Sequence, residues 1–440
     1  MTGFGKHAAL VVFLMASAGP GTAEAGGSEE PDPFALPQAA LGAICAGTDG
    51  DLSPDWPAVA ARFPGARWAD PAERPLRAGF RRIERRLTVD GATRLTFRAV
   101  LRDTALARLT IELDSRVAGA LRPRSMVLAG PDCAAVQGRA IGYSDDGLAR
   151  RVTVFDATLA RALGAEPLNP APPEGSDPGG VSVAVIDSGI AYTRPDIAAR
   201  LARDESGMIV GYDYWDMDAR PFDADTSVSP FFPRRHGTLV ADILLGEGPP
   251  LRLAAYRYPR PDMDRFTALI GNAAGAGVAV ATLAMGSNKA EDWRAFRAAA
   301  EAHGSILFIV SAGNNGRDID ETPVYPAAFD LANLLVVTSS TAAGSLGDGA
   351  NWEARAVDIA VPAEALTARG PAGRSRPVAG SSFAVPRVAA LAARFKAAHP
   401  RWTASDIKKA ILGLAGPMPA SETRPVRFGW IADPAGVSVE

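Results

Sequence analysis

The sequence predicts an α/β fold, a doubly wound parallel sheet preceded by a smaller β-rich N-terminal domain. After residue 180, short apolar runs rich in β-branched residues recur, as expected of strands buried on both faces. Stretches with helical spacing separate these runs, and such alternation is typical of a parallel sheet. Between residues 81 and 113, polar and apolar residues alternate instead, which predicts antiparallel strands with one face in water.

The composition of the 440-residue chain argues against several classes of partner. Its formal net charge is −3, with acidic and basic residues intermixed, so we expect no nucleic acid and no anionic membrane as a partner. A hydrophobic content of 47% can bury a large core, and the length suggests two or three domains.

The first 25 residues resemble a secretory signal peptide. Lys6 and His7 precede an apolar run at 8–18 that is too short to span a bilayer. Residues 23–25 offer a cleavage site, with 16–18 as the second choice, and an uncleaved anchor is the alternative. We therefore expect export to the periplasm or the medium, and no membrane segment in the mature form.

Residues 26–167 are predicted to form the β-rich N-terminal domain. Its first residues, to about Pro37, are rich in Gly, Glu and Pro and are expected to be disordered. Strands are predicted at 81–89, 93–100 and 107–113, with Asp90-Gly91 as a hairpin turn between the first two. The domain contains no evident catalytic cluster.

Both cysteines, Cys45 and Cys133, lie in this N-terminal part. In an exported chain, an even cysteine count suggests one disulfide, which would contribute at most about 4–5 kcal/mol by restricting the unfolded chain. Two unrelated buried thiols are the alternative.

Residues 168–180 have the Pro- and Gly-rich composition of a linker, and residues 181–440 form the second predicted domain. Its strands are expected at 181–186, 278–283, 306–310, 334–338 and 357–360, and helices at 265–275 and 291–303. In such sheets, functional sites lie at the carboxyl ends of strands.

Two side chains suited to acid–base chemistry lie at element ends in this domain. Asp187 directly follows the first buried strand, where an ordinary Asx turn is the alternative. His236 opens an apolar helix. Among the other histidines, His7 falls in the signal peptide, His303 closes a helix and His399 lies in a loop, so His236 is the one placed for base chemistry.

A serine and an asparagine complete the set. Ser382 precedes an Ala-rich helical stretch, with Pro386 expected in the first turn, so its neighbouring backbone amides can favour a negative charge. Asn314 follows a buried strand, and its amide could donate to an oxyanion. A capping serine and an ordinary turn are the alternatives. Because a serine hydroxyl needs a base, and the base needs a carboxylate, these residue types are complementary.

The motifs that carry these residues resemble those of the subtilisin-like serine proteases, the subtilases. The resemblance covers residues 181 to about 436 and includes the motifs VAVIDSG at 183–189, HGTLVA at 236–241, SAGN at 311–314 and GSSFAVP at 380–386. The sequence departs from the family pattern at Ser381, where threonine is usual, at Leu239 and Asp242, and at Ala284-Met285.

The resemblance implies an exported serine endopeptidase that acts on polypeptides and requires no organic cofactor. By this resemblance, Asp187 orients His236, His236 acts as base and then acid, and Ser382 is the nucleophile. Asn314 and the Ser382 amide would form the oxyanion hole. The substrate-binding strand would comprise Ala284, Met285 and Gly286.

The sequence allows alternatives for calcium binding, for the role of the N-terminal domain and for the function. Many relatives bind calcium, but the sequence places no calcium site, and the Asp-rich stretch at 213–225 reads better as a solvated loop. The N-terminal domain would act either as a removable prodomain that inhibits the enzyme or as a permanent domain. The rival functions are a catalytically silent subtilase-like binding or scaffold protein and an acyl-transferring or esterase-like enzyme.

Overall fold

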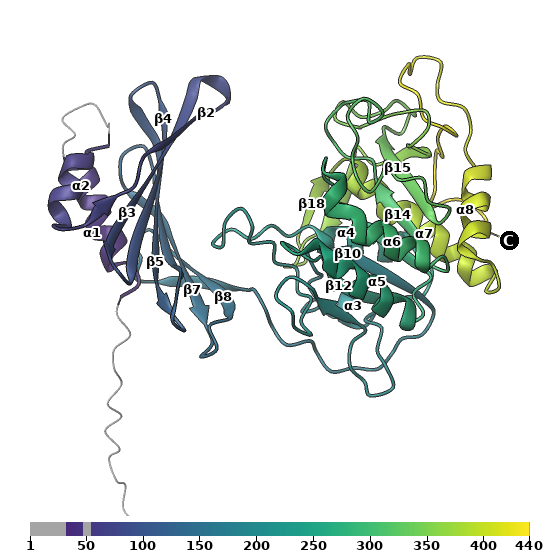
Figure 1. The fold of residues 1–440 in the computed structure, drawn as a ribbon, viewed down its shortest axis with the longest axis horizontal. Helices are drawn as coiled ribbons and strands as arrows, with labels where there is room; N and C mark the ends of the chain where they lie inside the picture. The colour runs from purple at the N-terminus through teal and green to yellow at the C-terminus, as the bar shows by residue number, and fades with distance from the viewer. Residues whose placement is uncertain (1–31, 47–53, 440) are drawn as a thin grey trace, which may run out of the picture.

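The computed structural model describes residues 32–46 and 54–439, so the expected signal peptide lies outside the described residues. These residues build two large sheets from successive parts of the chain (Figure 1), and a separate two-stranded sheet. The first is antiparallel and formed before residue 168, and the second is parallel and begins at residue 181.

The antiparallel sheet has nine strands among the described residues, in the order β1-β3-β4-β5-β6-β7-β8-β9, with β2 paired to β3. The three expected strands correspond to β3, β4 and β5, and Asp90-Gly91 lies at the turn between β3 and β4. The strands are β1 (Arg67–Trp68), β2 (Ala72–Pro75), β3 (Phe80–Asp90), β4 (Thr93–Arg102), β5 (Ala105–Val117), β6 (Ala120–Ala129), β7 (Ala135–Tyr143), β8 (Ala149–Phe155) and β9 (Ala162–Pro167), with a short 3₁₀ helix η1 (Arg77–Gly79).

One face of this sheet is covered by α1 (Ala35–Ile44) and α2 (Trp56–Arg62) (Figure 1). The disorder expected up to Pro37 is therefore wrong for its last residues. Phe34 is buried, and its ring lies 5.0 Å from that of Phe155. The apolar contact of Phe34 with the sheet orders a segment whose composition alone suggested none.

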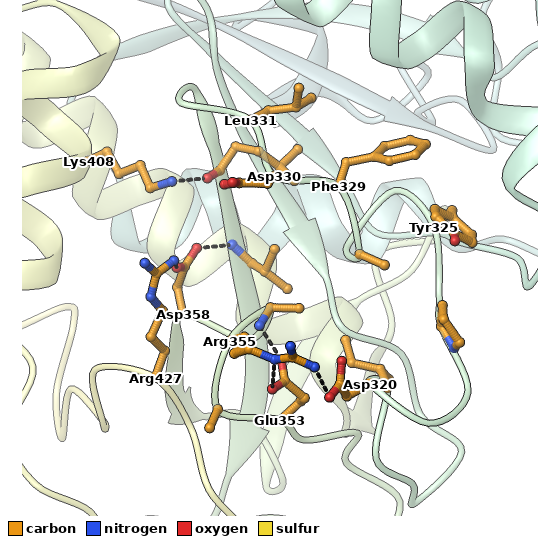
Figure 2. Close-up of a pocket in the computed structure, with 17 residues that line it drawn as sticks. Asp320, Tyr325, Phe329, Asp330, Leu331, Glu353, Arg355, Asp358, Lys408 and Arg427 are labelled. Carbon is orange, nitrogen blue, oxygen red and sulfur yellow. Dashed lines mark hydrogen bonds and ion pairs between the residues drawn. The ribbon is translucent and has the colours of Figure 1, made fainter.

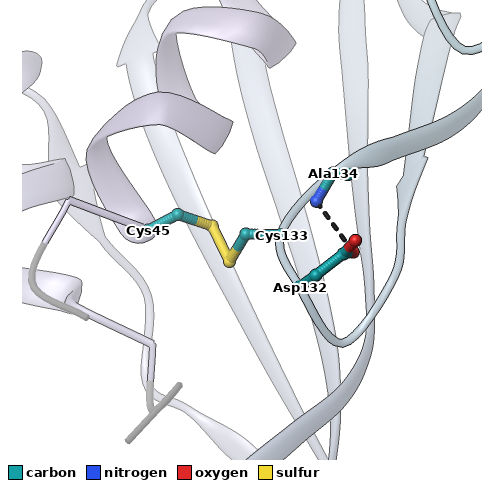
Figure 3. Close-up of a disulfide and its surroundings, with 4 residues drawn as sticks. All are labelled: Cys45, Asp132, Cys133 and Ala134. Carbon is teal, nitrogen blue, oxygen red and sulfur yellow. Dashed lines mark hydrogen bonds between the residues drawn. A yellow bond between two sulfur atoms is a disulfide. The ribbon is translucent and has the colours of Figure 1, made fainter. Parts of the chain in front are cut away.

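Cys45 and Cys133 form a disulfide in the structure (Figure 3). The bond joins the end of α1 to the turn between β6 and β7, with the two Cα atoms 6.1 Å apart and 88 residues apart in sequence. It therefore anchors the covering helix to the sheet.

The parallel sheet has the strand order β11-β12-β10-β13-β14-β15-β16. The five expected strands are present, and two further strands, β11 and β12, were not predicted from the sequence. In β12, Arg252 and Arg257 interrupt the apolar pattern, and Arg257 is buried because Asp213 and Asp216 pair with it. The strands are β10 (Val181–Asp187), β11 (Gly211–Asp213), β12 (Leu251–Arg257), β13 (Val280–Leu283), β14 (Leu307–Ser311), β15 (Leu334–Ser340) and β16 (Ile359–Pro362).

Helices pack on both faces of this sheet, which makes it doubly wound. The cluster on one face includes α4 (Gly237–Glu247) and α7 (Ser381–Ala398), and the cluster on the other includes α5 (Phe266–Gly275) and α6 (Arg294–Ala302). Remaining elements are α3 (Pro195–Ala198), η2 (Met263–Arg265), η3 (Ala290–Trp293), α8 (Ala404–Gly413) and the β17 (Leu366–Arg369)–β18 (Ser375–Val378) hairpin.

The helix α7 begins earlier than the proline suggested. It starts at Ser381, so Pro386 lies in its second turn instead of its first. Proline removes a helix hydrogen bond there, but α7 is buried along almost its whole length, and this packing outweighs the local cost.

Strand β10 is the point where the sheet order reverses, because β12 pairs on one side of it and β13 on the other. Ligand sites in open α/β sheets lie at the carboxyl ends of strands near such a point. Asp187 is the last residue of β10. Asp187 therefore lies where functional sites of such sheets are found.

Candidate active site

Asp187 and His236 are in direct contact at the carboxyl end of β10. The Nδ1 atom of His236 lies 2.8 Å from Oδ1 and 2.9 Å from Oδ2 of Asp187. Asp187 is buried, whereas His236 is half-buried and forms the N-cap of α4. This contact fixes the ring so that Nδ1 faces the carboxylate and Nε2 remains for other chemistry.

The carboxylate also determines the protonation of the ring. Burial alone lowers the pKa of His236, but the charge of Asp187 and its hydrogen bond to the ring more than offset burial, so the pKa lies above its usual value. Asp223 adds to the rise, and Arg376 opposes it. The pair is thus arranged to stabilise an imidazolium.

A second carboxylate, Asp223, ties the aspartate and histidine segments together. It is completely buried and accepts hydrogen bonds from Ser188 Oγ (2.6 Å) and the backbone amide of Thr238 (2.9 Å). In turn, Ser188 Oγ accepts from the amides of Gly237 (3.0 Å) and His236 (3.3 Å). Burial raises the pKa of the Asp223 carboxyl. From the sequence, Asp223 was recognised only as part of the Asp-rich stretch at 213–225, and its contacts with Ser188 and Thr238 were not predicted.

Ser382 lies in the first turn of α7, which places its backbone amide among those without a helical partner. Its hydroxyl donates to the carbonyl of Ala284 at 3.3 Å, and not to His236, in this structure. The neighbouring Phe383 ring lies 5.6 Å from the His236 ring, measured between centroids. The serine and histidine segments are therefore adjacent.

Asn314 is held against the start of the same helix. Its Oδ1 atom accepts hydrogen bonds from the amide and the hydroxyl of Ser381, both at 2.9 Å. Gly380 has a φ of +111°, and a Cβ there would lie 2.8 Å from Asn314 Oδ1, so only glycine fits without displacement. With Oδ1 engaged, the Nδ2 group of Asn314 is left to donate elsewhere.

The candidate substrate-binding residues follow β13 and line a cavity of about 180 Å³ beside Ser382. No charged side chain lines this cavity. Met285 is half-buried and Gly286 is exposed. The cavity is lined by Ala284, Met285, Gly286, Ser287, Asn288, Ser311, Gly313, Asn314, Asn315, Val324 and Ser382.

The Asp-rich stretch considered for calcium is engaged in other contacts. Arg257 pairs with Asp213 at 2.8 Å and also with Asp216, and Asp218 accepts from Asn169 at 2.7 Å. Within residues 32–46 and 54–439, no group of three or more His, Cys, Asp or Glu side chains is arranged to hold a metal ion. The carboxylates of Asp213, Asp216 and Asp218 are therefore engaged by Arg257 and Asn169 in this arrangement.

A larger cavity, of about 500 Å³, lies away from Ser382 between the 319–331 loop and Lys408 of α8 (Figure 2). Its charged groups contact their neighbours: Arg355 pairs with Asp320, Asp358 accepts from the Val336 amide, and Lys408 donates to the Leu334 carbonyl. None of the four candidate catalytic and oxyanion residues lines it. We therefore do not assign the reaction to this cavity.

A known protein family matches the part of the chain that contains the parallel sheet. Residues 179–430, more than half of the chain, match the sequence model of the subtilase family. The chain belongs to the subtilase family. The matched residues contain the whole parallel sheet, together with Asp187, His236 and Ser382.

Curated relatives of this subtilase are similar over part of their length. It is 34% identical to Subtilisin-like protease 7 of Arthroderma otae over 124 residues, which is 28% of this chain and 29% of the relative. It is 28% identical to the thermophilic serine proteinase of Bacillus sp. (strain AK1) over 236 residues, 49% of this chain and 51% of the relative. The matches thus span between about a third and a half of these relatives.

Solved structures are similar at lower identity. A cold adapted subtilisin-like serine proteinase aligns with a TM-score of 0.49 and 22% identity, covering 60% of this chain and 93% of its own. A lanthipeptide protease aligns with a TM-score of 0.48 and 18% identity, covering 59% and 89%.

Proposed function

We propose that this subtilase is an exported serine endopeptidase that cleaves polypeptides through an acyl-enzyme intermediate. The observation that carries the proposal is the contact of His236 Nδ1 with Asp187. Ser382 lies nearby in the first turn of α7, and Asn314 is hydrogen-bonded to the start of the same helix. These residues supply each side-chain type that activated serine chemistry requires.

In the first half of the reaction, the Ser382 hydroxyl turns from the Ala284 carbonyl toward His236 Nε2, which takes its proton. The Oγ atom then forms a bond to the carbonyl carbon of the substrate, and the carbonyl electron pair moves onto oxygen. Asn314 Nδ2 and the Ser382 amide stabilise this oxyanion, because they donate in a fixed geometry. When the intermediate collapses, the carbon–nitrogen bond breaks, and His236 returns the proton to the departing amine.

In the second half, water replaces the amine. His236 takes a proton from the water as its oxygen attacks the acyl carbon, and the ester bond to Ser382 then breaks. The proton returns to Ser382 Oγ, and the carboxylic acid product leaves. Throughout, Asp187 stabilises the charged imidazole without taking its proton. No organic cofactor takes part in these steps.

The substrate main chain would lie along Ala284, Met285 and Gly286, next to Ser382. The proposed export rests on residues 1–25, outside the described residues. Among the residues that the structure describes, no helix is both long and apolar enough to cross a bilayer.

The experiment is intact-mass analysis of the purified exported protein with and without a fluorophosphonate, beside Ser382→Ala. We expect one adduct on the wild type and none on the variant, followed by cleavage of a peptide substrate. The measured mass also reports whether the N-terminal domain has been removed as an inhibitory prodomain. A folded wild-type protein that forms no adduct and cleaves no peptide would overturn the proposal in favour of a silent scaffold. Turnover of simple esters without peptides would favour an esterase.

A further inference from the structure

The segment that leads into His236 forms an arm that reaches the N-terminal domain. We call residues 225–235 the histidine arm. Its two ends pair in antiparallel fashion, since the Asp225 amide donates to the Arg234 carbonyl (3.0 Å) and the Arg234 amide to the Asp225 carbonyl (2.8 Å). In Figure 1 a loop from the parallel-sheet domain extends toward the antiparallel sheet. The arm ends one residue before His236.

The tip of the arm is buried on the sheet face opposite α1 and α2. Phe231 has no exposed surface, and it belongs to the same apolar cluster as Met126, Ile141 and Val152 of strands β6, β7 and β8. Arg139 of β7 donates to the Phe231 carbonyl at 2.9 Å. The same guanidinium lies 4.2 Å from the centre of the exposed Phe232 ring. The N-terminal domain therefore holds the tip by both apolar and polar contacts.

The base of the arm is held by the same domain. Arg235 donates through Nη2 to the carbonyl of Pro167, the last residue of β9, at 2.8 Å. Through Nη1 it donates to the backbone carbonyl of Asp223. One guanidinium thus bridges the N-terminal sheet and the residue whose carboxylate ties together Ser188 and Thr238. Arg235 is also the immediate neighbour of His236.

None of the described residues of the N-terminal domain lines the cavity beside Ser382. Every residue that lines the cavity beside Ser382 lies between 284 and 382. The hydrogen bonds to the parallel-sheet domain reach the histidine arm and Asp218, which precede His236 in the chain. Such contacts can orient His236 and Asp187, and none of the residues that make them lines the cavity beside Ser382.

We propose that the N-terminal domain is a positioning domain: it holds the histidine arm at Phe231 and Arg235 and so fixes His236 against Asp187. The inference rests on the proposed peptidase function and makes Arg235 a positioning residue. It assigns the domain a lasting role in the active chain, different from that of an inhibitor.

The test uses the full mature chain with Phe231→Ala, Arg235→Ala and Arg235→Lys. The matched control is Val228→Ala, because Val228 lies on the same arm but is 63% exposed. Two kinds of measurement are made. Steady-state kinetics on a peptide give KM and kcat per active site titrated with a fluorophosphonate, and amide hydrogen exchange is followed across residues 222–238. Titration removes the effect of any misfolded fraction.

A misplaced catalytic group lowers the reaction rate by up to about a hundredfold. We therefore expect kcat per site to fall by about tenfold to a hundredfold in Phe231→Ala and Arg235→Ala, with KM within about twofold of the wild-type value. Exchange at 222–238 should rise in both, and Val228→Ala should change neither quantity. Arg235→Lys keeps the charge but lacks the planar fork, so it should recover only part of kcat.

Unchanged kcat per site in Phe231→Ala despite faster exchange would overturn the inference, as would increased activity, which would indicate inhibition. Unchanged exchange would show that the domain does not hold the arm. If the wild type forms no fluorophosphonate adduct, the proposed function fails on its own. In that case, exchange at 222–238 still decides whether the N-terminal domain holds this segment.

Discussion

The Ser381 hydroxyl donates to Asn314 Oδ1 at 2.9 Å and lies 2.7 Å from the hydroxyl of Ser311. Asn314 is exposed, so without this contact its amide could rotate and exchange its oxygen for its nitrogen. The backbone amide of Ser381 adds a second donor to the same oxygen. Serine thus keeps a hydroxyl where threonine is usual in the family, and with Oδ1 engaged the Nδ2 group of Asn314 remains for the proposed contact with the oxyanion.

We expect Asn314→Ala to lower kcat by about 10²–10³-fold with little change in KM, because its donor acts on charge that develops only in the transition state. Steady-state kinetics on a peptide measure both quantities. Asn314→Asp keeps the size but replaces the donor with a negative charge beside the oxyanion, so it should be at least as slow as Asn314→Ala. A reduction confined to KM would contradict this assignment.

Ser381→Ala should lower kcat less, by about tenfold or below, because the backbone amide of Ser381 still holds Asn314. Ser381→Thr should retain near wild-type activity, since it keeps the hydroxyl. In the double variant with Asn314→Ala, the Ser381 effect should disappear, because the serine acts through the asparagine. Additive losses would show that Ser381 acts by another route.

The acid limb of kcat/KM should lie above the usual histidine pKa of about 6.5. Burial lowers the pKa of His236, but Asp187 and, to a smaller extent, Asp223 raise this pKa by more than burial lowers it. The positive charge of Arg376 opposes the rise. Since the base must be neutral, activity should rise with pH as His236 loses its proton. Arg376→Ala removes an opposing positive charge, so it should move the limb to higher pH.

A pH–rate profile of both proteins at low and high salt checks this prediction. Arg376 is exposed, so added salt should screen its effect and bring the two profiles together. A limb that moves to lower pH in Arg376→Ala would contradict the assigned electrostatics.

The sequence predicted the strands and helices that carry the candidate site residues well, because their signals are local. Asp187 follows a run of buried residues, and Ser382 and Asn314 adjoin glycines that permit close approach. What it missed depends on contacts between distant segments. The strand β12 contains Arg257, whose burial only the carboxylates of Asp213 and Asp216 explain. The role of Asp223 likewise depends on two partners that lie 35 and 15 residues away.

Removing the disulfide should destabilise the N-terminal domain. The bond closes a loop with a sequence separation of 88, so Cys45→Ala with Cys133→Ala should lower the free energy of unfolding by at most about 4–5 kcal/mol. Thermal unfolding measures the loss, and reduction of the wild type should reproduce it. An unchanged midpoint in both cases would contradict a stabilising role.

Val324 should limit the side chain that enters the cavity beside Ser382. A Cβ at Gly286 would lie 3.0 Å from Val324 Cγ1, and one at Gly313 3.7 Å from the same methyl, so this methyl lies between the two glycines. Because Ser382 and Asn314 both line the cavity, it should receive the side chain of the residue whose carbonyl is attacked. We expect small, uncharged side chains at that substrate position.

Val324→Gly should therefore raise kcat/KM for phenylalanine relative to alanine at this position. Since each methylene in such a pocket changes discrimination by roughly 10–200-fold, a change of at least about tenfold is expected. Val324→Ala should be intermediate, and Val324→Ile should shift the preference the other way. Matched peptides that differ only at this residue give the ratio. An unchanged ratio across the series would show that Val324 does not limit the site.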